Sequence, residues 1–288
     1  MSSFHSLPSA RTGRPGVLCL HCSGSSGRQW RSLTAPLAAR FDIHTPDLLG
    51  YATPGGWAAG ARVTLDDEAE RLSGLLADAV GAVHLPGHSY GGAVALQMAL
   101  RWPERVASLT LYEPVRFALL LGPTVGSVDK AVDTADARYQ IVTTGNRFAL
   151  AVLSGRLDEA AEMFANYWGG PGTWAAMDAR RRQLQRALMP KVHAEFQALF
   201  SDRVPASAYE GLAMPVRLIG GTNSPLPARA VMRQLAAWLP RASTVTVVGL
   251  NHMGPINAPE RVRAHLPAWL QAGAATLDPA MPAELEAA

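Results

Sequence analysis

Short apolar runs alternate with longer segments of helical period along most of this chain. The apolar runs lie at 17–20, 41–47, 82–89, 105–112, 216–220 and 243–249. Segments 30–40, 64–80, 92–103, 228–239 and 259–270 carry apolar residues at helical spacing. Strands that alternate with helices predict an α/β fold, in which a mostly parallel central sheet is flanked by helices. Residues 4–14 show little apolar alternation, so no strand pair is expected before Val17.

Segment 117–210 interrupts this alternation. It has no convincing strand, is helical in pattern and contains large apolar residues, among them Trp168 and Trp174. The predicted organisation is a core made of residues 1–116 and 211–288, with 117–210 inserted as a helical cap. Such a cap would lie over the C-terminal ends of the strands, where α/β sheets bind ligands. A set of extra core helices is the plainer alternative. In the cap interpretation, Trp168 and Trp174 are expected to line an apolar substrate pocket.

Composition excludes several classes of partner. The formal net charge of the 288 residues is only +3, too small and too scattered to indicate nucleic-acid binding. No stretch approaches the ~18 consecutive apolar residues of a membrane helix, and the N-terminus shows no signal-peptide pattern. The only cysteines, Cys19 and Cys22, form a C-x-x-C pair without a second ligand pair, which is weak support for a metal. We expect a soluble cytoplasmic protein that needs no cofactor, and leave a homodimer open.

The stretch GHSYGG, residues 87–92, carries the strongest chemical signal. It matches G-x-S-x-G where a predicted strand meets a predicted helix from Gly92, the context in which this pattern presents a nucleophilic serine. Ser89 would occupy a strained turn, and the two flanking glycines would let the neighbouring backbone approach. The following helix would direct its N-terminal amides at a developing oxyanion. We therefore expect Ser89 to be a nucleophile.

From about Gly16 to Leu270, the chain resembles the α/β-hydrolase fold family with a helical cap. In that family a His-Gly loop after the first core strand lends a backbone N–H to the oxyanion hole, and HCSGSSGRQW (21–30) is the matching stretch. The resemblance implies that the amides of Ser23 and Tyr90 form the oxyanion hole. The loop departs from the family at Cys22, where relatives usually have glycine.

The resemblance also implies a histidine base after the last strand. GLNHMGPINAPE (249–260) supplies His252 at that connection. Other histidines lie within predicted strands or a helix, or flank the nucleophile. His252 also follows Ser89 and the candidate acids in the chain, as the order serine, acid, histidine requires.

The acid of the triad is missing from its usual place. Most relatives have an aspartate after the strand equivalent to 216–220, but here GGTNSP (220–225) puts Ser224 there, preceded by Asn223. Glu113 follows the strand at 105–112 in LTLYEPV, and some relatives, including a branch of the haloalkane dehalogenases, place the acid after that strand. A glutamate at the tip of an apolar strand needs a partner. We expect Glu113 to be the acid, in preference to Asp47 or to a glutamate with only a structural role.

A serine nucleophile in this fold excludes the dehalogenase and epoxide-hydrolase reactions, which use aspartate there. The leading hypothesis is hydrolysis of a carboxylic ester, a small-molecule substrate with an apolar acyl group, through Ser89, His252 and Glu113. Thioesters, lactones and carbon–carbon bonds are alternatives for the same residues. A ligand receptor that keeps the fold with weak turnover is an alternative of another class.

Overall fold

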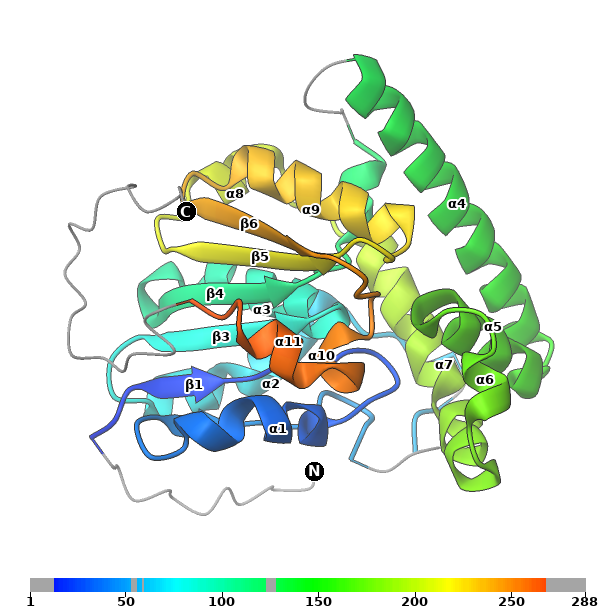
Figure 1. The fold of residues 1–288 in the computed structure, drawn as a ribbon, viewed down its shortest axis with the longest axis horizontal. Helices are drawn as coiled ribbons and strands as arrows, with labels where there is room; N and C mark the ends of the chain where they lie inside the picture. Colours follow the sequence, from blue (N-terminus) through cyan, green and yellow to red (C-terminus); the bar gives the residue numbers. More distant parts are fainter. Residues whose placement is uncertain (1–12, 53–55, 59, 123–127, 268–288) are drawn as a thin grey trace.

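Six strands form one parallel sheet in the computed structural model, in the order β2-β1-β3-β4-β5-β6 (Figure 1). The structure describes residues 13–52, 56–58, 60–122 and 128–267. The parallel sheet confirms the predicted α/β class. The strands are β1 (Gly16–Leu18), β2 (Asp42–His44), β3 (Val83–His88), β4 (Val106–Tyr112), β5 (Val216–Gly221) and β6 (Ala242–Val247).

Helices cover both faces of the sheet, and each face has its own apolar core. One core joins the sheet to α1 (Arg31–Thr34) and α11 (Pro259–Arg263), through residues such as Leu33 and Val262. The other joins it to α2 (Leu65–Asp78), α3 (Tyr90–Arg101) and α9 (Leu226–Trp238). The remaining helix of the core is α10 (Gly254–Asn257), which follows β6.

Local sequence explains the best-defined elements. Helix α2 begins with a capping box, in which the Asp67 N–H donates to Thr64 Oγ1 and the Thr64 N–H donates to Asp67 Oδ2. All six residues of β3 are buried, as expected for a central strand covered on both faces. The edge strand β6 instead has two exposed residues and only one buried residue. The strand that leads to Ser89 is therefore held rigidly in the core.

Some boundaries differ from those predicted. Segment 30–40 is not one helix but three short turns, η1 (Gly27–Trp30), α1 and η2 (Ala35–Leu37). Pro36 lies at the start of η2, where its ring and missing N–H prevent a continuous helix. Strand β2 covers only part of 41–47, and α11 ends at Arg263. The expectation for residues 4–14 lies almost wholly outside the described residues.

A helical insert, α4–α7, follows β4 and lies beyond the C-terminal ends of the strands (Figure 1). Helix α4 packs against α9 of the core and against α5, which in turn packs against α7. Among the described residues, no helix is long and apolar enough to cross a membrane. The elements of segment 117–210 are η4 (Phe117–Leu120), α4 (Val128–Leu153), α5 (Leu157–Gly169), α6 (Thr173–Ala176), α7 (Ala179–Ser201) and α8 (Ala206–Glu210).

Candidate active site

Ser89 lies on a sharp turn between β3 and α3. Its backbone has φ 56° and ψ −119°, outside the regions that a serine ordinarily adopts. A Cβ at Gly91 would come within 2.3 Å of Leu20 O, and one at Gly87 within 2.7 Å of the Cα of Gly92, so both positions require glycine. Helix α3 begins at Tyr90, two residues earlier than predicted, because Ser89 itself is the N-cap residue.

The structure brings Ser89, His252 and Glu113 into one hydrogen-bonded chain. His252 Nε2 lies 2.8 Å from Ser89 Oγ, and His252 Nδ1 lies 2.7 Å from Glu113 Oε2. The relative exposure of the three residues is 5% for Ser89, 2% for His252 and 0% for Glu113. Since the carboxylate can only accept, Nδ1 carries the ring proton and Nε2 accepts from the serine hydroxyl. This arrangement can take a proton from a serine that attacks a carbonyl.

Glu113 reaches His252 from the turn after β4. Its φ is 45°, and its other carboxylate oxygen, Oε1, accepts a hydrogen bond of 2.7 Å from the Gly221 N–H at the end of β5. The Glu113 carboxylate thus joins His252 to the end of the neighbouring strand β5. Ser224, after β5, is buried and its hydroxyl has no hydrogen-bond partner among the described residues. Asn223 is exposed, and its Nδ2 donates to Gly249 O.

Asp47, the rival carboxylate, makes a different contact. Its Oδ1 accepts a hydrogen bond of 2.8 Å from the Gly27 N–H, at the far end of the loop that begins with His21. His21 Nε2 accepts from the Leu48 N–H, and His21 Nδ1–H donates to Cys22 O. The segment around Asp47 therefore anchors the loop at two points.

The candidate oxyanion donors are the amides of Ser23 and Tyr90. In the described part of the chain, neither amide donates to a protein acceptor. Tyr90 is the first residue of α3, so its N–H is one of the unpaired amides at the helix N-terminus. Cys22 is a buried free thiol, and burial raises its pKa to about 12, so it stays neutral at ordinary pH.

A second hydrogen-bonded chain passes through His88, the residue before Ser89. The sequence did not suggest it. The Cys22 N–H donates to Gln29 Oε1 (3.1 Å), Gln29 Nε2 donates to His88 Nδ1 (3.3 Å), and His88 Nε2 donates to His252 O (2.8 Å). The direction of each hydrogen bond is fixed, because the peptide oxygen of His252 can only accept and His88 Nε2 must therefore carry the ring proton. Burial, followed by the neighbouring His252, lowers the pKa of His88 well below its ordinary value. A neutral His88 thus connects the loop to the backbone of His252.

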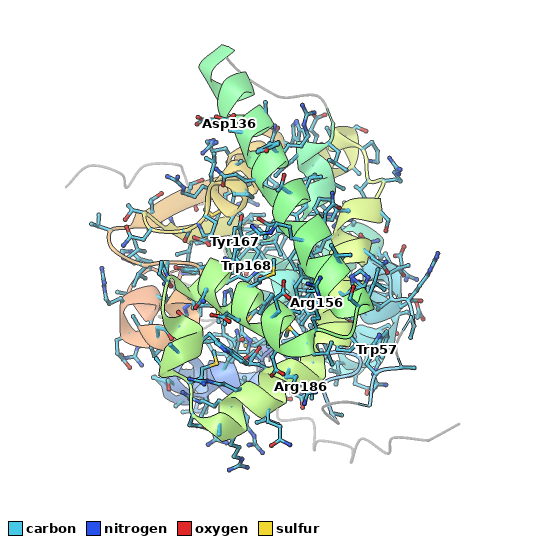
Figure 2. The ribbon with its side chains drawn as sticks, turned by 90° about the vertical axis from the view of Figure 1, so that its right-hand side faces the viewer. Trp57, Asp136, Arg156, Tyr167, Trp168 and Arg186 are labelled. Atoms are coloured by element: carbon cyan, nitrogen blue, oxygen red, sulfur yellow. The ribbon has the colours of Figure 1, made fainter. Side chains whose placement is uncertain are left out.

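The helical insert α4–α7, called the cap from here on, contacts the histidine. The ring of Trp168 in α5 is 4.2 Å from the ring of His252, centroid to centroid, and Asn251 Nδ2 donates to Gly169 O of the same helix (2.8 Å). Figure 2 looks onto the cap and shows Trp168 near its middle. Trp174 in α6 is half-buried, and Arg182 lies over its ring at 5.5 Å. Of the two tryptophans, Trp168 therefore lies at the candidate site, whereas Trp174 contacts other cap residues.

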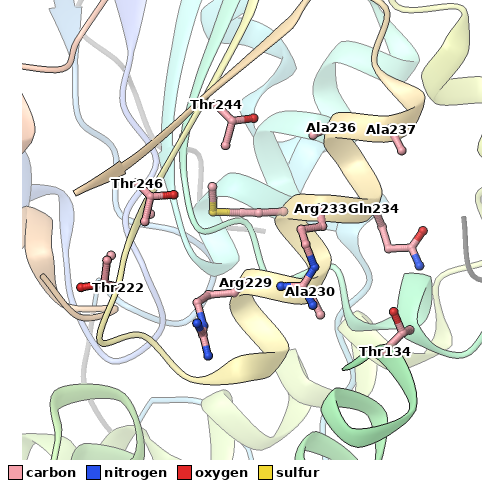
Figure 3. A pocket seen from close by; sticks show the side chains of 13 residues that line it. Thr134, Thr222, Arg229, Ala230, Arg233, Gln234, Ala236, Ala237, Thr244 and Thr246 are labelled. Carbon is pink, nitrogen blue, oxygen red and sulfur yellow. The ribbon is translucent and has the colours of Figure 1, made fainter. Parts of the chain in front are cut away.

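A cavity of about 550 Å³ lies elsewhere, between α9 and the ends of β5 and β6 (Figure 3). None of Ser89, His252 and Glu113 lines it. Gly220 forms part of its wall, and a Cβ there would come 3.1 Å from Glu113 Oε1, so the wall between cavity and carboxylate is one residue thick. Within the described ranges, no group of three His, Cys, Asp or Glu residues is placed to hold a metal ion.

Comparison with known proteins agrees with this fold. The alpha/beta hydrolase fold family matches residues 15–259, and the chain belongs to that family. A hydrolase from Pseudomonas aeruginosa PA01 superimposes with a TM-score of 0.70 at 20% identity, over 91% of this chain and 92% of that one. A thermophilic esterase from Thermogutta terrifontis gives 0.61 at 20% identity, over 90% of each chain.

Curated relatives are esterase- and lipase-like, and they match over part of their length. Lipase LipV of Mycobacterium tuberculosis is 36% identical over 140 residues, which is 46% of this chain and 51% of the lipase. The pimeloyl-[acyl-carrier protein] methyl ester esterase of Aeromonas hydrophila is 36% identical over 95 residues, 33% of this chain and 36% of that protein. The matched region thus spans about half or less of these relatives.

Proposed function

We propose that this protein hydrolyses a carboxylic ester through Ser89, His252 and Glu113. The observation that supports the proposal is the buried chain from Ser89 Oγ through both nitrogens of His252 to Glu113, with distances of 2.8 and 2.7 Å. Those distances suit a general base that is held by an acid. The names of LipV and of the methyl ester esterase, both ester hydrolases, also favour an ester.

The reaction would proceed by acyl transfer. Ser89 Oγ bonds to the carbonyl carbon while its proton passes to His252 Nε2, and the carbonyl oxygen becomes an oxyanion that accepts from the Ser23 and Tyr90 amides. Collapse breaks the ester bond, and the leaving alcohol takes the proton from His252. Water then attacks the acyl-serine with His252 again as base, and collapse of this second intermediate breaks the bond between the acyl carbon and Ser89 Oγ, returns the proton to Oγ and releases the carboxylic acid. Glu113 stabilises the imidazolium in both halves.

The acyl group would be apolar and would lie beneath the cap. Phe117 stacks on Trp168 with ring centroids 6.3 Å apart, and Phe196 and Phe200 adjoin Phe117. This aromatic group continues from the core into the cap beside His252. It favours hydrocarbon over a charged acyl chain, since a charge there would lose its hydration without a partner.

A fluorophosphonate probe, followed by peptide mass spectrometry, tests the proposal. Ser89 should carry the label, and Ser89→Ala should lose both labelling and turnover of every p-nitrophenyl ester that the wild type hydrolyses, with an unchanged melting temperature. Turnover that persists in Ser89→Ala would overturn the mechanism. Ligand binding without turnover in the wild type would favour a receptor.

A further inference from the structure

Both backbone polar groups of Gly24 are bound, and both contacts lead to the cap. The Gly24 N–H donates to Tyr51 Oη (2.9 Å), and Gly24 O accepts from Gln185 Nε2 (2.8 Å). Gln185 belongs to α7, and Gly24 directly follows Ser23, whose amide is a candidate oxyanion donor. The orientation of this loop therefore depends on where α7 lies.

Tyr51 connects the Gly24 N–H to α7 as well. Its hydroxyl donates to Glu195 Oε2 (3.0 Å), ten residues beyond Gln185 in α7. Burial, followed by the nearby Glu195 carboxylate, raises the pKa of Tyr51 well above its ordinary value. The hydroxyl thus keeps its proton for Glu195 and accepts from Gly24. One helix holds the N–H of Gly24 through Tyr51 and the C=O through Gln185.

A buried ion cluster fixes α7 against the core. Lys191 Nζ lies 2.8 Å from Glu195 Oε1 and 3.0 Å from Glu68 Oε1 of α2, and all three residues are fully buried. Glu68 Oε2 also accepts from the Leu49 N–H. A shift of the cap that separated these groups would leave buried charges unpaired, which is strongly unfavourable. The cluster therefore holds α7 in one position relative to α2.

The loop also has no room for a side chain beneath the cap. Gly24 has φ +70°, and a Cβ there would come 3.0 Å from Gln185 Oε1 and 3.3 Å from Phe164 Cε1 of α5. Gly24 is therefore held by close contacts with the cap as well as by its two hydrogen bonds.

We propose that the cap completes the oxyanion hole. In this proposal, which rests on the proposed function, Gln185 and the Tyr51–Glu195 pair are positioning residues that hold Gly24, and with it the Ser23 amide, in the geometry that binds the tetrahedral intermediate. The cap therefore acts on the rate of the chemical step as well as on the choice of substrate.

The contacts of Tyr51 and Gln185 with Gly24 are called the clamp here. Two substitutions test it, and each changes the shape of the side chain little. Tyr51→Phe removes the hydroxyl, and Gln185→Met keeps the length of the side chain but cannot donate. Gln183→Met is the matched control, because Gln183 is an exposed residue of the same helix. The measurements are kcat and KM on an ester that the wild type hydrolyses, and the inhibition constant of a trifluoromethyl ketone, whose adduct with serine carries an oxyanion.

Each clamp variant should lower kcat about tenfold, less than the ~10²–10³ lost with a whole oxyanion donor, and leave KM within about twofold. The ketone should bind more weakly by the same factor as kcat/KM, and Gln183→Met should match the wild type. The double variant should lose less than the product of the single losses, because both act on Gly24.

Wild-type kcat in both clamp variants, whatever their melting temperatures, would overturn the positioning role. A rise in KM with unchanged kcat would also overturn it, since uniform binding rather than transition-state binding would then be lost. If Ser89→Ala is inactive while the clamp variants are unaffected, only this inference fails. Activity in Ser89→Ala would overturn the proposed function and the clamp together.

Discussion

Ser89 and Glu113 are the two non-glycine residues with positive φ in the described part of the chain, at 56° and 45°. The Ser89 N–H donates to the oxygen of Tyr112, the residue before Glu113, at 3.0 Å. The two strained turns therefore lie at the ends of neighbouring strands and are hydrogen-bonded to each other. Strain of this kind persists only where surrounding structure imposes it. Here the surrounding structure is the junction of β3, α3 and β4, from which both side chains point at His252.

Glu113→Gln should lower kcat by up to about 10⁴-fold, the size of the loss when a triad acid becomes an amide. The glutamine can still accept from the Gly221 N–H, so the melting temperature should change little. Steady-state kinetics and thermal unfolding provide the check. Asp47→Asn serves as the comparison and should affect stability more than kcat, because Asp47 accepts from the Gly27 N–H in the loop.

Ser224→Asp should restore part of the activity of Glu113→Gln. Ser224 is buried where most relatives have the acid, and within the part of the chain that the structure describes its hydroxyl has no hydrogen-bond partner. A carboxylate there could approach His252 from β5. Partial recovery of kcat in the double variant is the expected result, and a double variant no better than Glu113→Gln would show that the loop cannot direct an acid at His252.

Gln29→Met should reduce kcat about tenfold and destabilise the fold by about 1–3 kcal/mol, the cost of leaving buried donors or acceptors unpaired. The substitution breaks the link from the Cys22 N–H to His88 and so to His252 O. Denaturant unfolding and kinetics measure the two effects. Arg28→Met, an exposed neighbour, is the control and should behave as the wild type. Equal kcat in both variants would contradict a role for this chain in catalysis.

Trp174→Ala and Trp168→Phe should have different effects. Trp174 contacts Arg182 rather than the candidate site, so its removal should change kcat and KM less than Trp168→Phe does. Trp168 is only 4% exposed and contacts Phe117 and His252, so truncation to alanine would cost ~3–5 kcal/mol, and phenylalanine is the usable probe. Trp168→Phe should change kcat through the contact with His252. A series of esters of increasing acyl length measures both.

Stability should fall as the pH drops from 6.5 towards 4, partly because of His84. Burial lowers the pKa of His84 to about 4, below the unfolded value of 6.5. Within this window the unfolded chain binds a proton that the folded chain does not, so the free energy of unfolding decreases with falling pH. His84→Gln, which can still pair with Ser108 Oγ, should flatten the decrease in melting temperature between pH 7 and pH 5. A slope equal to that of the wild type would contradict it.

Local sequence patterns were sufficient to predict the sheet and the turn at Ser89, because strand period, helix period and glycine spacing are short-range signals. Glu113 could be predicted only indirectly, from an apolar strand that ends in a carboxylate and from the missing aspartate near Ser224. The cluster of Glu68 and Lys191 could not be predicted, since the two residues are 123 positions apart and each is unremarkable within its own helix.

The hydrogen-bonded chain from Cys22 through Gln29 and His88 to His252 could not be predicted either, because its members are far apart in the sequence. In the sequence, His88 is only one of the two variable residues of G-x-S-x-G. Its role depends on Gln29 of η1, which is 59 positions away. The single helix predicted over 30–40 failed for a different reason. There the apolar spacing was helical, but Pro36 breaks the backbone hydrogen bonds that the spacing alone suggests.

The delivery of Glu113 from β4 has a consequence for how such chains are recognised. Because Glu113 brings a carboxylate to His252 from β4, the turn after β5 needs no acidic residue for that contact, and its sequence here is GGTNSP. A linear pattern that demands G-x-x-D-P would discard this chain as a degenerate, inactive copy. Classification should therefore ask which strand end brings a carboxylate to the histidine.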